Sequence, residues 1–302
     1  MIFPGQGAQA PGLGTPWVDH PAWAIVERAE KATGEALAPL LTTAPAEDLA
    51  RTREAQLVVF LASLLAWEVA GPALEDADVV AYAGHSLGQV TALVAAGALA
   101  FDDGCRLATR RAAHTQAAAD ARPGRLAALL GATVEQAQDS CAAAAGECWI
   151  ANDNAPGQVV IGGTPAGVEA ASAKAKELGV KRVMALNVGG AFHTPLMQGA
   201  ADAFAADLAA APFADTTVPV LSNPDARPYT DAAGWPERLA EQLVRPVRWA
   251  STMPALVGLG ATTFVEVGPG TTLTGLAKRA APDVVLRNVA TPHDLPLEIA
   301  HA

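Results

Sequence analysis

The segment Gly84-His85-Ser86-Leu87-Gly88 could place a serine nucleophile on a sharp turn between a strand and a helix. This G-x-S-x-G pattern is the nucleophile elbow, in which glycines leave room for a strained turn that projects the serine hydroxyl. Free amides at the start of the following helix would face the negative charge that develops on a substrate carbonyl. The pattern favours covalent acyl chemistry at Ser86, and a purely structural glycine turn is the alternative.

A serine nucleophile needs a base, and His193 is the histidine best placed to be one. It stands in the segment Gly189–Pro195, between an expected strand and an expected helix, where strand-end catalytic residues collect. A capping or core histidine is the alternative. No acidic residue between Ser86 and His193 stands out as a third member, so a triad and a dyad oriented by a backbone carbonyl both stay open. Protonation of the base should slow acylation at acid pH.

The other histidines are weaker candidates for the base. His85 adjoins the serine and should point elsewhere, whereas His293 and His301 lie in an expected loose tail. The assignment therefore rests on His193.

Hydrophobic patterning predicts the elements that position these groups. Residues 79–83 form an apolar run typical of a buried strand, and residues 87–100 follow as a helix, which is the context that an elbow requires. Further helices are expected at 21–34, 47–53, 55–70, 103–121, 195–211, 236–244, 251–259 and 273–280, with strands at 218–222 and 262–267. Alternating strands and helices predict an α/β fold with a mostly parallel sheet.

The order of expected strands and helices changes after Arg122-Pro123-Gly124. Strands are expected at 126–130, 149–151, 159–161 and 180–188, with helices at 134–145 and 165–178. This βαββαβ order is that of the ferredoxin-like split motif. It predicts a small domain, residues 121–190, inserted into a large domain made of residues 1–120 and 191–302.

Composition excludes several classes of protein. The chain has 302 residues, of which 51% are hydrophobic and 17% charged, so it can bury a sizeable core and is not a disordered tail. Its formal net charge of −11 argues against nucleic acid or an anionic membrane as a partner. The stretch 79–101 lacks charged residues and is long enough to span a bilayer, but the polar elbow within it argues against that.

The cysteines and the N-terminal residues point to the cytoplasm. The spacings of Cys105, Cys141 and Cys148 match no zinc signature and no disulfide framework, so they are expected to be buried thiols in a reducing compartment. The first residues lack a basic region followed by an apolar stretch, and no signal peptide is expected.

Six segments occur in an order that resembles the malonyl-CoA:acyl carrier protein transacylases of fatty-acid and polyketide synthesis. They are Phe3-Pro4-Gly5-Gln6-Gly7, Gly84-His85-Ser86-Leu87-Gly88, residues 152–158, Gly190-Ala191-Phe192-His193, residues 242–249 and Glu266-Val267-Gly268-Pro269-Gly270. The resemblance covers nearly the whole chain. It implies an α/β-hydrolase-like large domain with a parallel-sheet core and an inserted ferredoxin-like small domain.

The same resemblance implies roles for individual residues. Ser86 would be the nucleophile and His193 the base, with the backbone carbonyl of Gln242 orienting the imidazole. The backbone amides of Gln6 and Leu87 would form the oxyanion hole.

The acyl pocket is likewise assigned by resemblance. Arg111 falls where the family binds the malonate carboxylate, and Asn152 and Asn154 lie near the acyl group. Phe192 precedes the base; in polyketide relatives a phenylalanine there accompanies malonyl, and a serine accompanies the branched methylmalonyl unit. A buried carboxylate needs a partner, and the fork of an arginine fits it.

The sequence departs from the family at two places. The residue after the elbow is usually Glu and is Gln89 here. The arginine is usually followed by Gly and a Met, whereas this chain has Arg111-Ala112-Ala113-His114-Thr115-Gln116. Arg110 is adjacent but lies about 100° around the helix, so only one of the two arginines can face the pocket.

The resemblance implies ping-pong transfer of a malonyl group from malonyl-CoA to the phosphopantetheine thiol of an acyl carrier protein, by a monomer without metal or redox cofactor. Three alternatives are an acyl-carrier-protein hydrolase, a trans-acting polyketide acyltransferase with another acyl unit, and a non-catalytic docking subunit. Because carrier proteins are acidic, a local basic patch is expected. Its candidates are Arg122, Arg125, Lys181, Arg182, Lys278 and Arg279.

Overall fold

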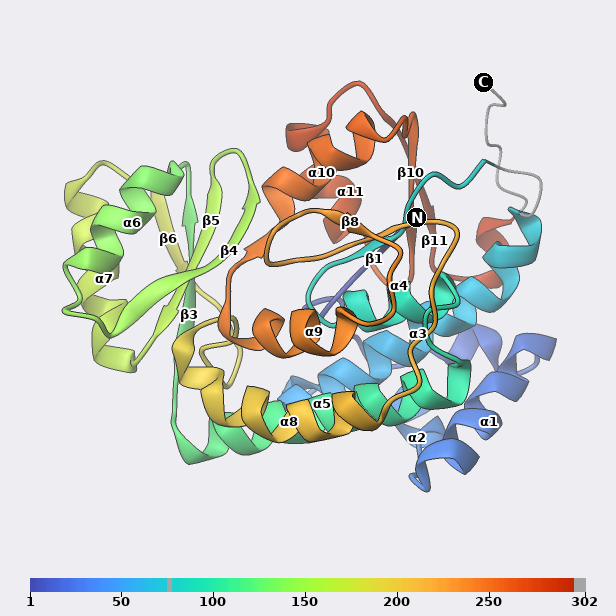
Figure 1. The fold of residues 1–302 in the computed structure, drawn as a ribbon. Helices are drawn as coiled ribbons and strands as arrows, with labels where there is room; N and C mark the ends of the chain where they lie inside the picture. Colours follow the sequence, from blue (N-terminus) through green and yellow to red (C-terminus); the bar gives the residue numbers. More distant parts are fainter. Residues whose placement is uncertain (75–77, 296–302) are drawn as a thin grey trace.

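A parallel sheet lies at the centre of the larger part of the molecule (Figure 1). The computed structural model describes residues 1–74 and 78–295. The sheet has the order β11-β10-β1-β2 and consists of β1 (Ile2–Phe3), β2 (Ala83–Gly84), β10 (Thr263–Val267) and β11 (Val285–Val289). All its pairs are parallel. A bridge from Tyr82 to Val220 continues it toward a hairpin of β7 (Val220–Leu221) and β8 (Pro228–Tyr229).

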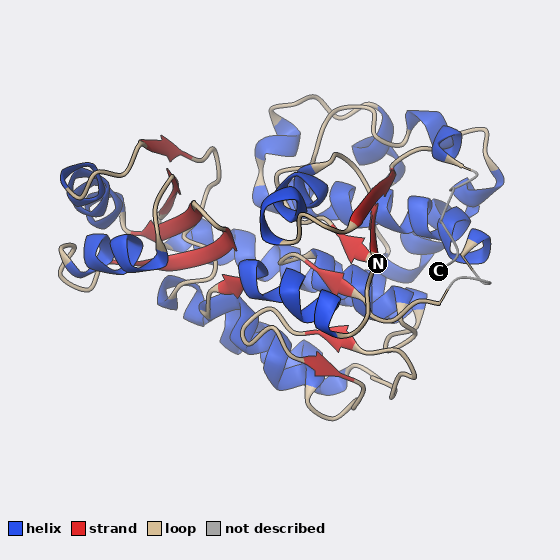
Figure 2. Ribbon diagram, turned by 90° about the horizontal axis from the view of Figure 1, so that it is seen from above, coloured by secondary structure: helices blue, strands red, loops and turns tan. Residues whose placement is uncertain are grey.

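Helices surround this sheet on both sides, as Figure 2 shows. They are α1 (Ala24–Thr33), α2 (Ala38–Thr42), α3 (Thr52–Ala73), α4 (Gly88–Ala95), α5 (Phe101–Ala121), α8 (Gln198–Ala210), α9 (Trp235–Val244), α10 (Trp249–Gly258) and α11 (Thr272–Ala280). Short 3-10 turns occupy Thr15–Trp17, Pro21–Trp23, Asp48–Ala50, Pro195–Met197 and Pro292–Asp294.

Helix α3 is the central helix of this part. Every residue from Ala55 to Ala66 is buried, so the helix is enclosed on all sides rather than amphipathic. Among the described residues it is the one helix long and apolar enough to cross a bilayer, and most of that stretch is buried inside the protein. The uncharged stretch 79–101 instead contains β2, the elbow and α4.

An antiparallel sheet with two helices forms the smaller part, at the left of Figure 1. Its elements are β3 (Arg125–Leu130), α6 (Val134–Ala142), β4 (Cys148–Ala155), β5 (Gln158–Gly163), α7 (Pro165–Glu177) and β6 (Arg182–Ala185). The strand order β6-β3-β5-β4 and the βαββαβ sequence are those of the ferredoxin-like motif. The division of the chain into domains at about residues 121 and 190 stays a prediction.

The two faces of this sheet have different neighbours. Ala127 and Leu129 pack with α6 and α7, whereas Leu126 and Ala128 belong to a cluster on the other face that reaches Phe192. This alternation follows from the two-residue period of a strand. Beyond β4, the short strand β9 (Val247–Arg248) pairs parallel with it, so residues from outside 121–190 complete the sheet.

Several sequence-based boundaries are wrong. The expected helix at 47–53 is only a 3-10 turn, because Arg51 is extended and α3 begins after it. The expected helix at 87–100 ends near Gly97, whose φ of 78° stops it. The strand expected at 149–151 is longer than predicted, since β4 continues to Ala155. Strand β11 was not expected, because Arg287 and Asn288 interrupt its apolar pattern.

The elbow requires both of its glycines. A Cβ on Gly84 would lie 1.8 Å from the carbonyl oxygen of Gly88, and one on Gly88 would lie 2.2 Å from the carbonyl oxygen of Phe3. These contacts are with backbone atoms, which cannot move aside cheaply. The close approach of β1, β2 and α4 therefore depends on the two missing side chains.

We expect Gly84→Ala to lower the free energy of unfolding by about 1–3 kcal/mol, because the added methyl overlaps backbone. Chemical denaturation measures this. Gly199→Ala on α8 is the matched control, since Gly199 is exposed and a Cβ there meets nothing within 4 Å. The control should be neutral or stabilising by up to about 1 kcal/mol. Equal stability of the two variants would contradict the packing argument.

Candidate active site

Ser86 lies at the tip of the turn between β2 and α4. Its φ is 54°, in the left-handed region that non-glycine residues rarely adopt. Asn223 holds this turn: its Oδ1 accepts the backbone N–H of Ser86 at 2.7 Å, and its Nδ2 donates to the carbonyl of Gly84 at 2.8 Å. Asn223 follows the short strand β7, and nothing in the sequence pattern singled it out.

His193 contacts the hydroxyl of Ser86. The Ser86 Oγ lies 2.7 Å from His193 Nε2, and His193 Nδ1 lies 2.7 Å from the backbone carbonyl oxygen of Gln242. That carbonyl can only accept, so Nδ1 carries the proton and Nε2 is free to accept from Ser86. Within the described residues no carboxylate contacts His193, and the geometry is that of a Ser–His dyad oriented by a backbone carbonyl.

The imidazole of His193 is held by its backbone as well. Its φ is 61°, and its N–H donates to the carbonyl of Leu243 at 3.1 Å. The residue therefore docks onto the last turn of α9, which also supplies Gln242. The turns that contain Ser86 and His193 are far apart in the chain, and each residue has a positive φ. The hydrogen bond between Ser86 Oγ and His193 Nε2 joins them.

Burial keeps the base neutral. Burial and, to a lesser extent, the positive charge of Arg111 lower the pKa of His193 to about 3. The imidazole is 4% exposed, so its charged form would lose most of its hydration. The loss of activity expected at acid pH is therefore expected at a lower pH than for an ordinary histidine.

Arg111 is a buried cation that faces the serine. It is 3% exposed on α5, and its Nη2 donates to Ser86 Oγ at 3.2 Å and to the side-chain Oε1 of Gln242 at 3.1 Å. Nη1 donates to the side-chain oxygen of Gln56. Burial lowers the pKa of Arg111 to about 10, so the guanidinium stays charged at neutral pH.

The partners of this arginine are all neutral. Across residues 1–74 and 78–295, no carboxylate forms an ion pair with Arg111, and its Nε has no hydrogen-bond partner. Arg110, by contrast, has a side chain that is 67% exposed and lies 3.7 Å from Asp207. The structure therefore brings Arg111 to the serine and leaves Arg110 on the surface.

Contacts between α3 and α5 fix the position of Arg111. Gln56 on α3 donates to Thr115 Oγ1 at 2.9 Å, and that hydroxyl donates to the Arg111 carbonyl at 2.8 Å. Gln56, like Asn223, was missed by sequence reasoning, because a lone buried amide has no characteristic spacing.

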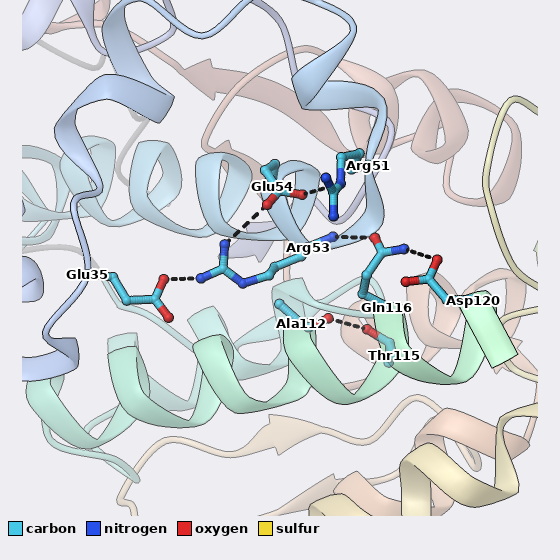
Figure 3. Close-up of polar contacts among 8 residues, drawn as sticks. All are labelled: Glu35, Arg51, Arg53, Glu54, Ala112, Thr115, Gln116 and Asp120. Carbon is cyan, nitrogen blue, oxygen red and sulfur yellow. Dashed lines mark hydrogen bonds and ion pairs between the residues drawn. The ribbon is translucent and has the colours of Figure 1, made fainter.

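The beginning of α3 is tied to α5 at the surface, as Figure 3 shows. The backbone N–H of Arg53 donates to Gln116 Oε1 at 3.3 Å, and Gln116 Nε2 donates to Asp120 at 2.7 Å. The Arg53 guanidinium pairs with Glu35 and Glu54. These contacts set the relative position of the two helices, and thereby the position of Gln56 beside Arg111.

A cleft between the two parts of the molecule leads to Ser86. Its empty volume is about 1050 Å³, part of it open to solvent, and it is lined by Ser86, His193, Arg111, the loop after β1 and residues of the antiparallel sheet. Asn152 and Asn154 of β4 line it, each less than 10% exposed, and so does the half-buried ring of Phe192. Asn154 Oδ1 accepts from His85 Nε2 at 2.9 Å, which connects β4 to the elbow.

The two amides expected to bind an oxyanion belong to the loop after β1 and to the elbow. Gln6 lines the cleft, and Leu87 is the cap residue at the start of α4. Neither backbone N–H donates a hydrogen bond to any described residue. A Cβ on Gly5 would lie 2.4 Å from the carbonyl oxygen of His85, which shows how closely the loop of Gln6 approaches the elbow.

The remaining histidines lie away from the dyad. His20 caps the 3-10 turn Pro21–Trp23, His114 contacts Asp207 at 2.7 Å, and His293 is in the turn Pro292–Asp294. His301 is outside the described residues. In the described part of the chain, no group of three or more His, Cys, Asp or Glu side chains could hold a metal ion.

The chain is similar to known proteins over nearly its whole length. The acyl transferase domain family matches residues 1–291. The malonyl CoA-acyl carrier protein transacylase of Bacillus subtilis is 38% identical over 304 residues, covering 99% of this chain and 95% of its own. The protein of the same name from Synechocystis is 39% identical over 298 residues, covering 97% of each.

Solved structures of similar proteins superpose on this chain over nearly its whole length. The malonyl-CoA:acyl carrier protein transacylase of Xanthomonas oryzae superposes with a TM-score of 0.91 at 38% identity, over 97% of this chain and 94% of that one. A malonyl-transacylase in complex with its type II polyketide acyl-carrier protein superposes with a TM-score of 0.91 at 32% identity, over 98% and 96%.

We expect the rate of acylation of Ser86 to stay flat from pH 8 down to about pH 5, because His193, with a pKa of about 3, remains neutral and able to accept a proton. Burial disfavours the charged form of the imidazole and so lowers its pKa. The acylation rate is therefore lost only as the pH falls through that lowered pKa. Stopped-flow acylation under single-turnover conditions measures it. A half-maximal rate near pH 6.5 would show that the imidazole is solvated, against this geometry.

Proposed function

Since this chain belongs to the malonyl-CoA:acyl carrier protein transacylase family of acyltransferases, we propose that it moves a malonyl group from malonyl-CoA to the phosphopantetheine thiol of an acyl carrier protein. The transfer passes through an ester on Ser86 and uses His193 as the general base. The relatives support the overall reaction, and the geometry of the dyad supports the route.

One observation carries the choice of acyl group: Arg111 is a buried cation beside Ser86 Oγ that has only neutral partners. A buried charge without a counter-charge is costly, and a ligand carboxylate would remove that cost. A malonyl group esterified to Ser86 carries such a carboxylate, whereas an acetyl group does not.

The first half-reaction acylates the serine. His193 Nε2 takes the proton of Ser86 Oγ as that oxygen attacks the thioester carbonyl of malonyl-CoA. The backbone amides of Gln6 and Leu87 donate to the oxyanion, a contribution of about 3 kcal/mol for one donor in a characterised enzyme. The C–S bond then breaks, and His193 returns the proton to the departing CoA thiolate.

The second half-reaction reverses these steps with a different thiol. His193 deprotonates the phosphopantetheine thiol, which attacks the malonyl ester, and Ser86 leaves and regains the proton. Every step moves a proton and an acyl group only, so the proposed chemistry uses neither a metal nor a redox cofactor.

The setting of the enzyme follows from the same proposal. We propose that it acts in the cytoplasm as a monomer that meets its carrier protein at the mouth of the cleft. All six candidate basic residues are exposed. Of these, Arg279 on α11 contacts Gln158, a residue that lines the cleft, so a positive charge lies at its rim. An acidic carrier would be attracted to this side.

We expect Ser86→Ala to form no covalent adduct and to lose nearly all turnover while folding normally, because the hydroxyl is the attacking atom. Radiolabelled malonyl-CoA and intact-protein mass spectrometry measure the adduct. In the unmodified enzyme the label should discharge onto a carrier protein that bears phosphopantetheine. Discharge to water would indicate a hydrolase, and absence of label would indicate a docking subunit.

We expect Arg111→Ala to lower kcat/KM for malonyl-CoA by about 30-fold to several thousand-fold, because the malonate carboxylate loses its buried partner. Transfer of an acetyl group should stay level or rise. Arg110→Ala is the matched control, since its side chain is largely exposed. The readout is the ratio of malonyl to acetyl kcat/KM. An unchanged ratio in Arg111→Ala, or a collapsed one in Arg110→Ala, would overturn the assignment.

We expect the enzyme to prefer malonyl-CoA over methylmalonyl-CoA by tens-fold, because the ring of Phe192 lines the cleft and leaves little room for a methyl branch. Phe192→Ser should reduce that preference. Competition between the two CoA esters, followed by mass spectrometry of the acyl-enzyme, measures it. Equal rates for both esters in the unmodified enzyme would refute the prediction.

A further inference from the structure

A fully buried amide lies behind the elbow and touches no part of the cleft surface. Gln89 is the second residue of α4 and is 0% exposed. Its Oε1 accepts from Gln242 Nε2 at 2.7 Å and from the backbone N–H of Asn223 at 3.2 Å, and its Nε2 lies 3.4 Å from the carbonyl oxygen of Leu221. The side chain of Gln89 thus accepts a hydrogen bond from α9 and donates one to β7.

Both partners of Gln89 hold the dyad. Asn223 fixes the backbone of Ser86 through its side chain, and Gln242 orients His193 through its backbone carbonyl. The side chain of Gln242 also reaches the reacting residues: its Nε2 lies 2.9 Å from the carbonyl oxygen of Ser86, and its Oε1 accepts from Arg111. Displacing Gln89 would therefore weaken the contacts that hold Ser86, His193 and Arg111.

We propose that Gln89 is a positioning residue for acyl transfer, which fixes the nucleophile through Asn223 and the base through Gln242 by a single bifurcated contact. The proposal rests on the proposed function only in its choice of reaction; the network itself is independent of the acyl group. Gln89 does not reach the substrate, so its effect is on the geometry and charge of the dyad.

The chemistry of an amide suits this place. An apolar side chain would leave the backbone N–H of Asn223 without its acceptor and would remove the shortest of the three contacts of Gln242 Nε2. A carboxylate would keep the acceptor but lose the donor to Leu221, and it would add a negative charge. The titratable groups that face His193 are Arg111 on α5 and His85 beside the elbow, and neither is an anion. A carboxylate here would thus favour the imidazolium.

The rate of phosphonylation of Ser86 by a fluorophosphonate tests the proposal without malonyl-CoA or a carrier protein. We expect Gln89→Leu to react roughly tenfold to a hundredfold more slowly at pH 8, as for the loss of one or two buried hydrogen bonds. Gln89→Glu should react faster than Gln89→Leu at pH 8. Its rate should begin to fall at a higher pH than that of the unmodified protein, because the carboxylate raises the pKa of His193.

Thr91→Val is the matched control. Thr91 is also fully buried on α4, and its Oγ1 has no hydrogen-bond partner among the described residues. Its rate and pH profile should equal those of the unmodified protein. Thermal unfolding of each variant shows whether it is folded at the assay temperature, and the pH dependence of Gln89→Glu should be reversible, which misfolding would not produce.

Two results would overturn the proposal. One is a phosphonylation rate of Gln89→Leu that equals that of Thr91→Val, and the other is a profile of Gln89→Glu that begins to fall at the same pH as that of the unmodified protein. Failure of the proposed function gives a different pattern: Ser86 would still react with the fluorophosphonate in the expected order of variants, but malonyl-CoA would leave no ester on the protein.

Discussion

The surrounding structure holds Ser86 and His193 so that a hydrogen bond of 2.7 Å forms between Ser86 Oγ and His193 Nε2. Both residues have positive φ, which costs free energy at a non-glycine position. Each turn is therefore held by several backbone contacts. Asn223 clamps the serine turn, the end of α9 clamps the histidine turn, and the missing side chains of Gly84 and Gly88 let the strands and α4 come close enough. The fold brings together residues that are 107 positions apart.

The positive charge of Arg111 lies beside this contact and would favour an acyl group that carries a carboxylate. The site holds a buried guanidinium, neutral amides and a neutral imidazole, and within the described residues no anion pairs with Arg111. The same positive charge that would bind a carboxylate also disfavours protonation of His193. Binding of an acidic acyl group and maintenance of the base are thus linked through one residue. The cleft that leads to Ser86 is lined by the loops that follow β1 and β2 and by residues of the ferredoxin-like sheet.

The sequence predicts a site best where a residue type and its spacing are compatible with only one local backbone geometry. The glycines around Ser86 need a strand-to-helix turn, and His193 between a strand and a helix follows from the α/β rhythm. The backbone carbonyl of Gln242 could be named only by resemblance to a family, because a carbonyl carries no residue signature. Gln56 and Asn223 were missed for a related reason: buried amides act through long-range contacts that a linear pattern does not contain. Strand β11 was missed because its polar residues break the apolar pattern, although they occur in a strand at the end of the sheet.

A crystal structure of the malonyl-enzyme tests the central claim most directly. The deacylation-impaired variant His193→Ala, incubated with malonyl-CoA in the absence of a carrier protein, would retain any ester that forms slowly. We expect an ester on Ser86 Oγ with the malonate carboxylate within hydrogen-bond distance of both terminal nitrogens of Arg111, which would exchange its contact with Gln242 for that carboxylate. An ester whose carboxylate points to solvent, or an acyl group on any other residue, would contradict it.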